Sequence, residues 1–191
     1  MKRYRNEGED EDQYSVQCLE TEFDISYRGA ICQAGADEFL SLLRNAAHQI
    51  KTFHYMRSIV VYLASSGGDV FTGFTLYEHI RELVHSGIQI EVVAEGFVAS
   101  AATLLLCAAS KRRMRKTAIL LIHSIISSGG NWLKPTEMEI ETHNTFKLME
   151  ILKMVYRKHS NLKKTALEKL LDKDVYLSFD DAQALDLIDG V

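Results

Sequence analysis

Three strand-length segments alternate with helix-forming segments in the middle of this chain. Residues 58–64, 88–94 and 118–122 are rich in Val, Ile and Leu, which is typical of strands buried on both faces. The segments between them either carry apolar residues at helical spacing or consist of small, helix-prone residues. Strands joined by helical crossovers lie parallel in one sheet. The sequence therefore predicts an α/β fold with a parallel sheet at its centre.

Residues that could take part in catalysis follow the ends of these strands. Gly67 and Gly68 follow the first, Ser100 lies at the turn after the second, in residues 96–100, and His123 follows the third. Equivalent ends of parallel strands share one edge of the sheet, so we expect these residues to converge. A serine nucleophile needs a base to accept its proton and backbone N–H donors for the oxyanion. A serine at a helix start is also a common N-cap, so the residues alone leave both interpretations open.

Backbone groups beside these residues complete the candidate site. Gly68 and Ala101 are the expected oxyanion donors, since Ala101 opens a helix-prone segment whose unpaired N–H groups favour negative charge. The backbone after Gly68 and after His123 is expected to offer unpaired edges to which an extended peptide adds as a strand. The residues of these two edges are Asp69, Val70, Ser124, Ile125 and Ile126.

Composition limits the other possibilities. A chain of 191 residues with 47% hydrophobic content fits one domain with a sizeable core. A formal net charge of −4 gives no reason to expect nucleic-acid binding. The three cysteines cannot all pair and lack metal-site spacing, so we expect no zinc site and a reduced compartment. The serine chemistry considered above requires no metal and no cofactor. Residues 1–12 lack the apolar core of a signal peptide and no apolar run is long enough for a membrane span, so a cytoplasmic location is expected.

Outside the central region, periodicity predicts helices and a polar N-terminus. Helical spacing of apolar residues marks residues 36–54 and the long stretch 136–159. Residues 1–20 are expected to form a flexible N-terminal segment, although alternation from Tyr14 onward suggests short strands. The basic cluster at residues 111–116 is interpreted as a solvated loop, and a nucleic-acid patch is the less favoured alternative.

Several motifs together resemble one known family. They are Ser65-Ser66-Gly67-Gly68 followed by Gly73 and Tyr77, then Gly96-Phe97-Val98-Ala99-Ser100-Ala101-Ala102, and then Ile122-His123. Their order and spacing are similar to those of the proteolytic subunit of the Clp protease. The C-terminal run from Asp172 to Val191 resembles the ending of the same family. The resemblance covers residues 20 to 190.

The resemblance implies a ClpP/crotonase-like ββα superhelix that forms a single peptidase domain over residues 21–191. Residues 124–160 would be the handle region, whose long helix interdigitates between stacked rings, and the N-terminus would form axial loops. Asp174 falls on the acid of a Ser100–His123–Asp174 triad. The implied activity is that of a serine-type endopeptidase, ATP-independent by itself, that hydrolyses peptides and unfolded proteins inside two stacked heptameric rings, a tetradecamer. The implied partner is an AAA+ unfoldase ATPase.

Departures from the family pattern keep other functions open. Ser66 replaces the usual Pro, Ala102 replaces a Gly, and Asp69 puts a carboxylate beside the oxyanion donors, where it would oppose negative charge. At the ATPase docking surface only Tyr62 remains of the usual aromatics, beside Val60 and Glu82, which argues against docking to the usual ATPase. The alternatives are a catalytically weak ring subunit with a structural or regulatory role, and a crotonase-type enzyme acting on acyl-coenzyme A.

Overall fold

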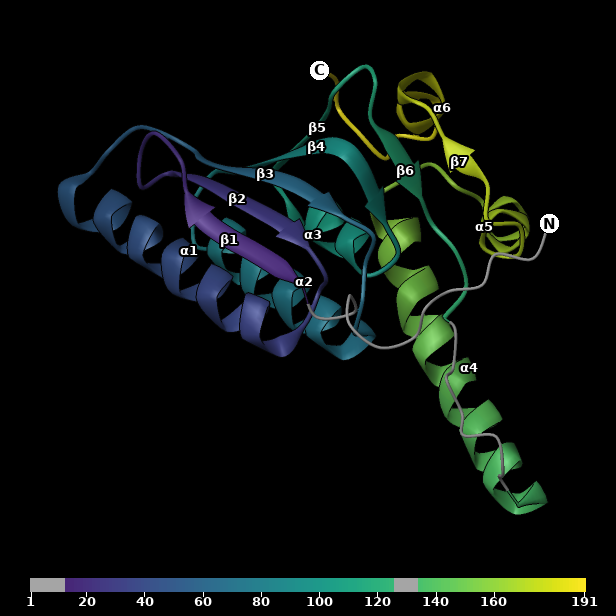
Figure 1. Ribbon diagram of the computed structural model, residues 1–191. Helices are drawn as coiled ribbons and strands as arrows, with labels where there is room; N and C mark the ends of the chain where they lie inside the picture. Colours follow the sequence, from purple (N-terminus) through teal and green to yellow (C-terminus); the bar gives the residue numbers. More distant parts are fainter. Residues whose placement is uncertain (1–12, 126–133) are drawn as a thin grey trace.

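A seven-stranded mixed sheet lies at the centre of the chain, for which a computed structural model describes residues 13–125 and 134–191 (Figure 1). Within these residues the strand order is β1-β2-β3-β4-β6-β7, and β5 pairs with β4 beside this path. The pairs among β2, β3, β4, β5 and β6 are parallel, whereas β1 and β7 run antiparallel to their neighbours. The strands are β1 (Tyr14–Cys18), β2 (Asp24–Gly29), β3 (Ile59–Ser65), β4 (Ile90–Ala99), β5 (Lys111–Met114), β6 (Ile119–Leu121) and β7 (Tyr176–Leu177). The predicted α/β class is confirmed.

Helices cover one face of this sheet and extend beyond its end. They are α1 (Gln33–Phe53), α2 (Val70–His85), α3 (Ala102–Ala108), α4 (Pro135–Lys158), α5 (Lys164–Leu171) and α6 (Phe179–Ala184). Figure 1 shows α1, α2 and α3 packed side by side against the sheet, with α4 leaving its edge. Every residue of α3 is buried, because this short helix lies between the sheet and α2. The sequence predicted α1 to α4, but not α5.

Strand β4 changes neighbours halfway along its length. Residues 91–94 pair with β5, and residues 97–99 pair with β6. Between these two parts Gly96 has φ of 57°, a conformation that favours glycine. The prediction of a turn at residues 96–100 was therefore wrong, because the strand bends at Gly96 and continues to Ala99.

The basic cluster forms a strand and not a solvated loop. Residues Lys111–Met114 pair in parallel with β4 as β5. Acidic residues of the same chain face the cations: Arg112 bonds Asp189 at 2.5 Å, Arg113 bonds Glu91 at 2.5 Å, and Arg115 bonds Glu95 at 3.2 Å. The loop prediction is wrong because these intrachain pairs let consecutive cations join the sheet. This pairing leaves little basis for a nucleic-acid patch.

The N-terminal boundary differs from the prediction. Residues 14–18 form β1, which is antiparallel to β2 in continuous register. Val16 packs into the core from this strand. The ordered sheet thus begins within the segment that the sequence assigned to a flexible N-terminus, residues 1–20. The proposed axial loop falls on residues 1–12, which lie outside the described residues.

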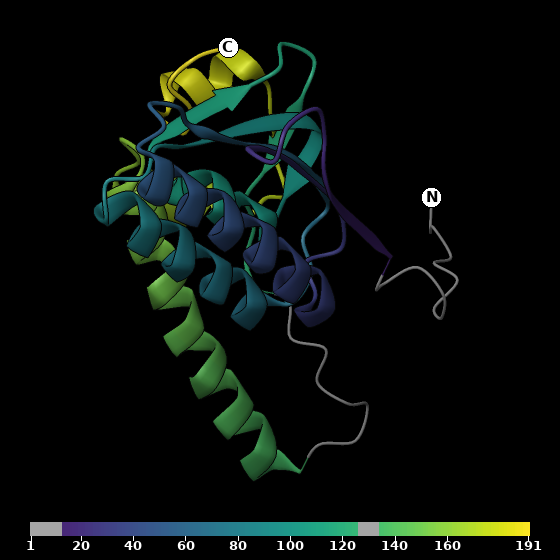
Figure 2. The ribbon, with the colours of Figure 1, turned by 90° about the vertical axis from the view of Figure 1, so that its left-hand side faces the viewer.

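Helix α4 projects away from the domain over most of its length (Figure 2). It begins at Pro135 with a capping box, in which the Glu137 carboxylate accepts the N–H of Lys134 at 2.7 Å. Its buried residues are Leu152, Val155 and Tyr156, all near the C-terminal end. The apolar side chains that stay exposed on it are Met138, Ile140, Phe146, Ile151 and Met154. The handle region predicted at 124–160 therefore contains a long protruding helix, and residues 126–133 of it lie outside the described chain.

A tyrosine–histidine contact joins α2 to the end of α4 and makes stability depend on pH. The Tyr77 hydroxyl lies 2.9 Å from His159 Nε2. Burial, reinforced by the positive charges of Arg81, Lys158 and Arg112, lowers the pKa of His159 to about 4. In the unfolded chain this imidazole titrates near its ordinary pKa of about 6.5, so the unfolded state binds a proton first as the pH falls.

We therefore expect His159 to reduce the free energy of unfolding as the pH drops from about 6.5 to 4, by about 1–2 kcal/mol after allowance for solvent screening. Urea unfolding at pH 7 and pH 5 measures this loss. Replacing His159 by Gln should make it smaller, whereas replacing the exposed His85 by Gln should not. An equal loss in His159→Gln and the wild type would show that folding does not lower the pKa of His159.

Candidate functional site

The turn that carries Ser100 is held in an unusual backbone conformation. Ser100 follows β4 directly and has φ of 54°, in the left-handed region that non-glycine residues seldom adopt. Its N–H donates to the carbonyl oxygen of Leu121 on β6 at 2.9 Å. Such strain costs about 1–3 kcal/mol and persists only where the surroundings impose it, commonly at functional sites. Neighbouring strands thus present the Ser100 side chain at the edge of the sheet.

Gly67 lies directly against this turn. A Cβ at Gly67 would stand 2.5 Å from Ser100 Cβ, 2.9 Å from the Ala99 carbonyl oxygen and 3.2 Å from the Ala101 nitrogen. Gly67 also has φ of 97°, so a side chain is excluded by both space and conformation. Gly67 and Ser100, 33 residues apart in the sequence, are therefore neighbours, as the strand ends predicted.

The two expected oxyanion donors flank this contact. Gly68 follows Gly67, and Ala101 follows Ser100. Within residues 13–125 and 134–191, neither N–H group donates to another group of the chain. An N–H group without an acceptor in the folded chain is what an oxyanion donor needs. Their role as donors stays a prediction.

Asp69 is held in place by its own helix. Its carboxylate accepts the N–H and the hydroxyl of Thr72, both at 2.7 Å, and so caps α2. Its N–H donates to Ile31 at 2.8 Å, and its carbonyl accepts from Gly73 at 3.0 Å. The expected unpaired edge is therefore wrong at Asp69, because both backbone groups are already bonded and Val70 begins α2. The carboxylate that would oppose an oxyanion is committed to capping.

His123 and Asp174 come from neighbouring antiparallel segments. In the β6–β7 pair Leu120 faces Leu177 and Leu121 faces Tyr176. This ladder ends before both residues: His123 lies two residues after β6, and Asp174 lies in a turn two residues before β7. His123 is half-buried and Asp174 is exposed, with φ of 31°. No hydrogen bond joins Ser100, His123 and Asp174 in the described chain, so their meeting as a triad stays a prediction.

The segment after His123 contacts α4 and α5. The N–H and hydroxyl of Ser124 both donate to the Leu171 carbonyl, at 2.9 and 3.0 Å. The N–H of Ile125 points at the sulfur of Met149 on α4, at 3.3 Å. These two N–H groups are therefore occupied, contrary to the expected free edge. Ile126, the last residue of that predicted edge, lies outside the described residues.

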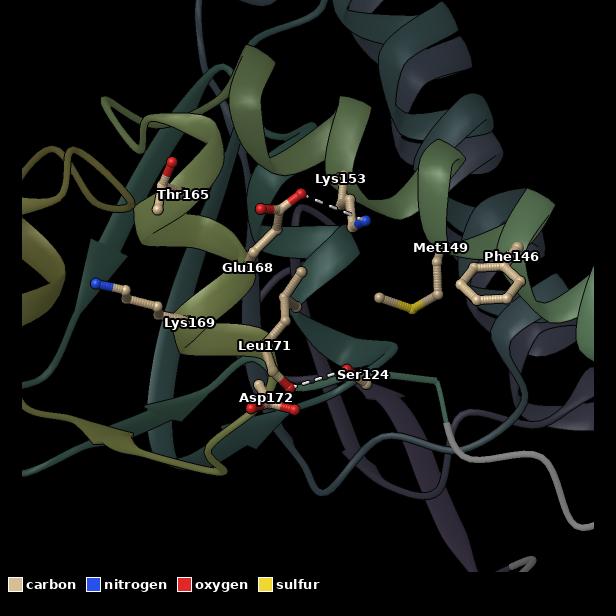
Figure 3. Close-up of a pocket in the computed structure, with 9 residues that line it drawn as sticks. All are labelled: Ser124, Phe146, Met149, Lys153, Thr165, Glu168, Lys169, Leu171 and Asp172. Carbon is tan, nitrogen blue, oxygen red and sulfur yellow. Dashed lines mark hydrogen bonds and ion pairs between the residues drawn. The ribbon is translucent and has the colours of Figure 1, made fainter.

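A pocket opens beside this segment. It has a volume of about 470 Å³ and lies between α4, α5 and Ser124 (Figure 3). Lys153 reaches into it, 2.9 Å from Glu150 and 3.9 Å from Glu168. The residues around the pocket are Ser124, Phe146, Met149, Lys153, Thr165, Glu168, Lys169, Leu171 and Asp172. The sequence reading missed the α5 side because it did not identify that helix, although Thr165, Glu168, Lys169 and Asp172 recur at helical spacing.

Two features of other protein classes are not found in the described part of the chain. None of its helices combines the length and the apolar character that a membrane crossing requires. Residues 13–125 and 134–191 hold no group of three or more His, Cys, Asp or Glu side chains placed to share a metal ion.

Comparisons with curated proteins point to one family. The chain is 30% identical over 135 residues to ATP-dependent Clp protease proteolytic subunit 1 of Tropheryma whipplei strain Twist, a match over 71% of this chain and 65% of the relative. It is 27% identical over 156 residues to the proteolytic subunit 1 of Chlamydia caviae, over 78% of this chain and 80% of that protein. The chain thus spans about two thirds of the length of the Tropheryma relative.

A solved structure and a family model agree with these relatives. A mutant of ClpP1 from Listeria monocytogenes superposes with a TM-score of 0.75 over 88% of this chain and 90% of that one, at 22% sequence identity. The predicted ClpP/crotonase-like fold is therefore confirmed. The family model described as Clp protease matches residues 7–191, nearly the whole sequence. The low identities make this a divergent example, and the chain belongs to the Clp protease family.

Proposed function

We propose that this chain is the peptidase core of a self-compartmentalised serine protease that hydrolyses peptides and unfolded proteins. The observation that carries the proposal is the Ser100 turn: a strained serine lies against Gly67, and the N–H groups of Gly68 and Ala101 have no acceptor among the described residues. The relatives are named as proteolytic subunits, which agrees with this chemistry.

In this mechanism Ser100 attacks a peptide carbonyl and His123 accepts the serine proton. The N–H groups of Gly68 and Ala101 donate to the oxyanion of the tetrahedral intermediate, a donor being worth about 3 kcal/mol. His123 then protonates the leaving amine, and water completes the cycle by hydrolysing the acyl-enzyme. Asp174 orients the imidazole and stabilises its charged form.

Substrate binding requires a change at one edge of the site. An extended peptide would take the N–H groups of Ser124 and Ile125, which now bond Leu171 and Met149. The chain therefore exchanges internal hydrogen bonds for substrate bonds when it binds a peptide. The pocket beside Ser124 would receive a substrate side chain, with Phe146 and Met149 as apolar contacts.

Assembly is part of the proposal. The apolar side chains exposed on α4 form a surface that a single chain leaves in water, which is typical of an interface. We expect heptameric rings stacked as a tetradecamer, in which α4 lies between the rings. An AAA+ unfoldase would supply unfolded substrate, while peptides would need no ATP. At the positions that correspond to the family's docking surface, α2 exposes Glu82, and β3 carries Val60 and Tyr62, so binding of the usual ATPase is not expected.

A fluorophosphonate probe tests the chemistry directly, because it reacts only with an activated serine. We expect one label per chain, located by mass spectrometry on the peptide that contains Ser100, together with cleavage of short fluorogenic peptides. Light scattering on the same sample should give the mass of fourteen chains. A particle of that mass without label would support the structural ring subunit instead.

A further inference from the structure

The conformation of Ser100 is fixed from inside the domain as well as from the sheet. The Ser100 carbonyl accepts the N–H of Thr103 at 3.0 Å and the hydroxyl of Thr103 at 2.6 Å. Threonine hydroxyls often bond the carbonyl three residues earlier, so this contact alone is ordinary local structure. The Thr103 hydroxyl has a second partner, however, which is far away in the sequence.

The Thr103 oxygen also lies 2.7 Å from the hydroxyl of Tyr156, which belongs to the last turn of α4. The Ser100 carbonyl has no proton, so Thr103 must donate its single hydroxyl proton there. Tyr156 must then donate to Thr103. The hydrogen bonds therefore run in one direction, from Tyr156 through Thr103 to Ser100, and each strengthens the next.

Burial makes this chain of hydroxyl groups costly to interrupt. Thr103 is 2% exposed and Tyr156 is 1% exposed. Burial also raises the pKa of Tyr156, so its hydroxyl keeps the proton that it donates. Removing either hydroxyl leaves a buried polar atom with fewer partners, in contact with a backbone that is already strained.

We infer that Thr103 and Tyr156 are positioning residues for Ser100, because their hydroxyl groups link α4 to the carbonyl of the strained Ser100 turn. This inference rests on the proposed function, in which Ser100 is the nucleophile. In this mechanism Tyr156 and Thr103 do not contact the substrate and take no part in the proton transfers. They act by holding the Ser100 backbone where its side chain faces the oxyanion donors.

The test uses Tyr156→Phe and Thr103→Val, which remove hydroxyls while nearly keeping shape, and Thr103→Ser, which restores one. Tyr77→Phe is the matched control, since its hydroxyl also bonds a residue near the end of α4 but does not reach Ser100. We expect Tyr156→Phe and Thr103→Val each to lower kcat and the rate of fluorophosphonate labelling about tenfold, with KM changed less than about twofold. The double variant should be no slower than either single one, because both interrupt the same chain of bonds.

Rescue and hydrogen exchange decide between positioning and general packing. Thr103→Ser should return kcat to within about twofold of the wild type, and Tyr77→Phe should leave it unchanged. Amide exchange of residues 100–103 should be faster in Tyr156→Phe and Thr103→Val than in Tyr77→Phe. Unchanged exchange, or an equal loss of kcat in Tyr77→Phe, would overturn the inference. A wild type without label at Ser100 would instead overturn the proposed function, while the exchange data would still report on the turn.

Discussion

Replacing Ser100 by Ala is expected to lower kcat for peptide hydrolysis by roughly 10⁶-fold, because the substitution removes the nucleophile and leaves its base without a partner. The reaction that remains would use water, assisted only by the oxyanion donors. KM should change little, since the Ser100 hydroxyl contributes little to ground-state binding. Hydrolysis of short fluorogenic peptides, followed over hours at high enzyme concentration, measures the residual rate.

The matched control is Ser86→Ala. Its hydroxyl donates to the Leu83 carbonyl at 2.8 Å near the end of α2, so its loss removes one exposed hydrogen bond and no chemistry. We expect this variant to retain the full rate. Peptide turnover that survives Ser100→Ala at more than about a hundredth of the wild-type rate would remove Ser100 from the mechanism.

Replacing Gly67 by Ala is expected to damage both stability and the site. The added methyl would stand 2.5 Å from Ser100 Cβ, so the Ser100 turn must move away. With φ of 97° the substitution also places a side chain in the left-handed region, at about 1–2 kcal/mol. We expect a total loss of about 3–5 kcal/mol in the free energy of unfolding and no fluorophosphonate labelling.

Gly87 separates these two costs. Its φ is 92°, almost that of Gly67, and a Cβ there would meet nothing within 4 Å. Gly87→Ala should therefore lower the free energy of unfolding only by the conformational cost, about 1–2 kcal/mol. Its Ser100 should still react with the fluorophosphonate. Urea unfolding of both variants at one protein concentration gives the difference, which isolates the contact with Ser100. Equal losses in the two variants would contradict the close packing of Gly67 on the turn.

The central strands and the large helices could be predicted because their signals are local and long. The apolar residues of α1 recur at helical spacing, and Pro135 marks the first turn of α4. Convergence of Gly67 and Ser100 followed from topology alone, because parallel strands end at one edge. These predictions needed no knowledge of side-chain packing.

The sequence failed where long-range partners override local preference. Gly96 is typical of a turn, yet here it is a bend inside β4. Arg112 and Arg113 join a strand because Asp189 and Glu91 neutralise them, and Asp189 is distant in the sequence. The contact between Thr103 and Tyr156 was equally hidden, since a threonine in α3 and a tyrosine in α4 carry no joint signal.

Asp174 has no local sequence signal that would mark it as a site residue. Only the family resemblance singled it out, because it is one of many carboxylates on the surface. The strand that places it, β7, is two residues long and too short for periodicity to detect. The β6–β7 ladder ends before both His123 and Asp174, so strand pairing does not supply the assignment either.

The bend in β4 divides this strand into one part that pairs with β5 and another that pairs with β6. The last three residues of β4 take their hydrogen bonds from β6, so the ladder that presents Ser100 does not include β5. Mutations that remodel the charged outer strand can then accumulate without moving the reactive edge. A lineage can thus acquire a new exterior, and new neighbours in an assembly, while the chemistry that it inherited is retained.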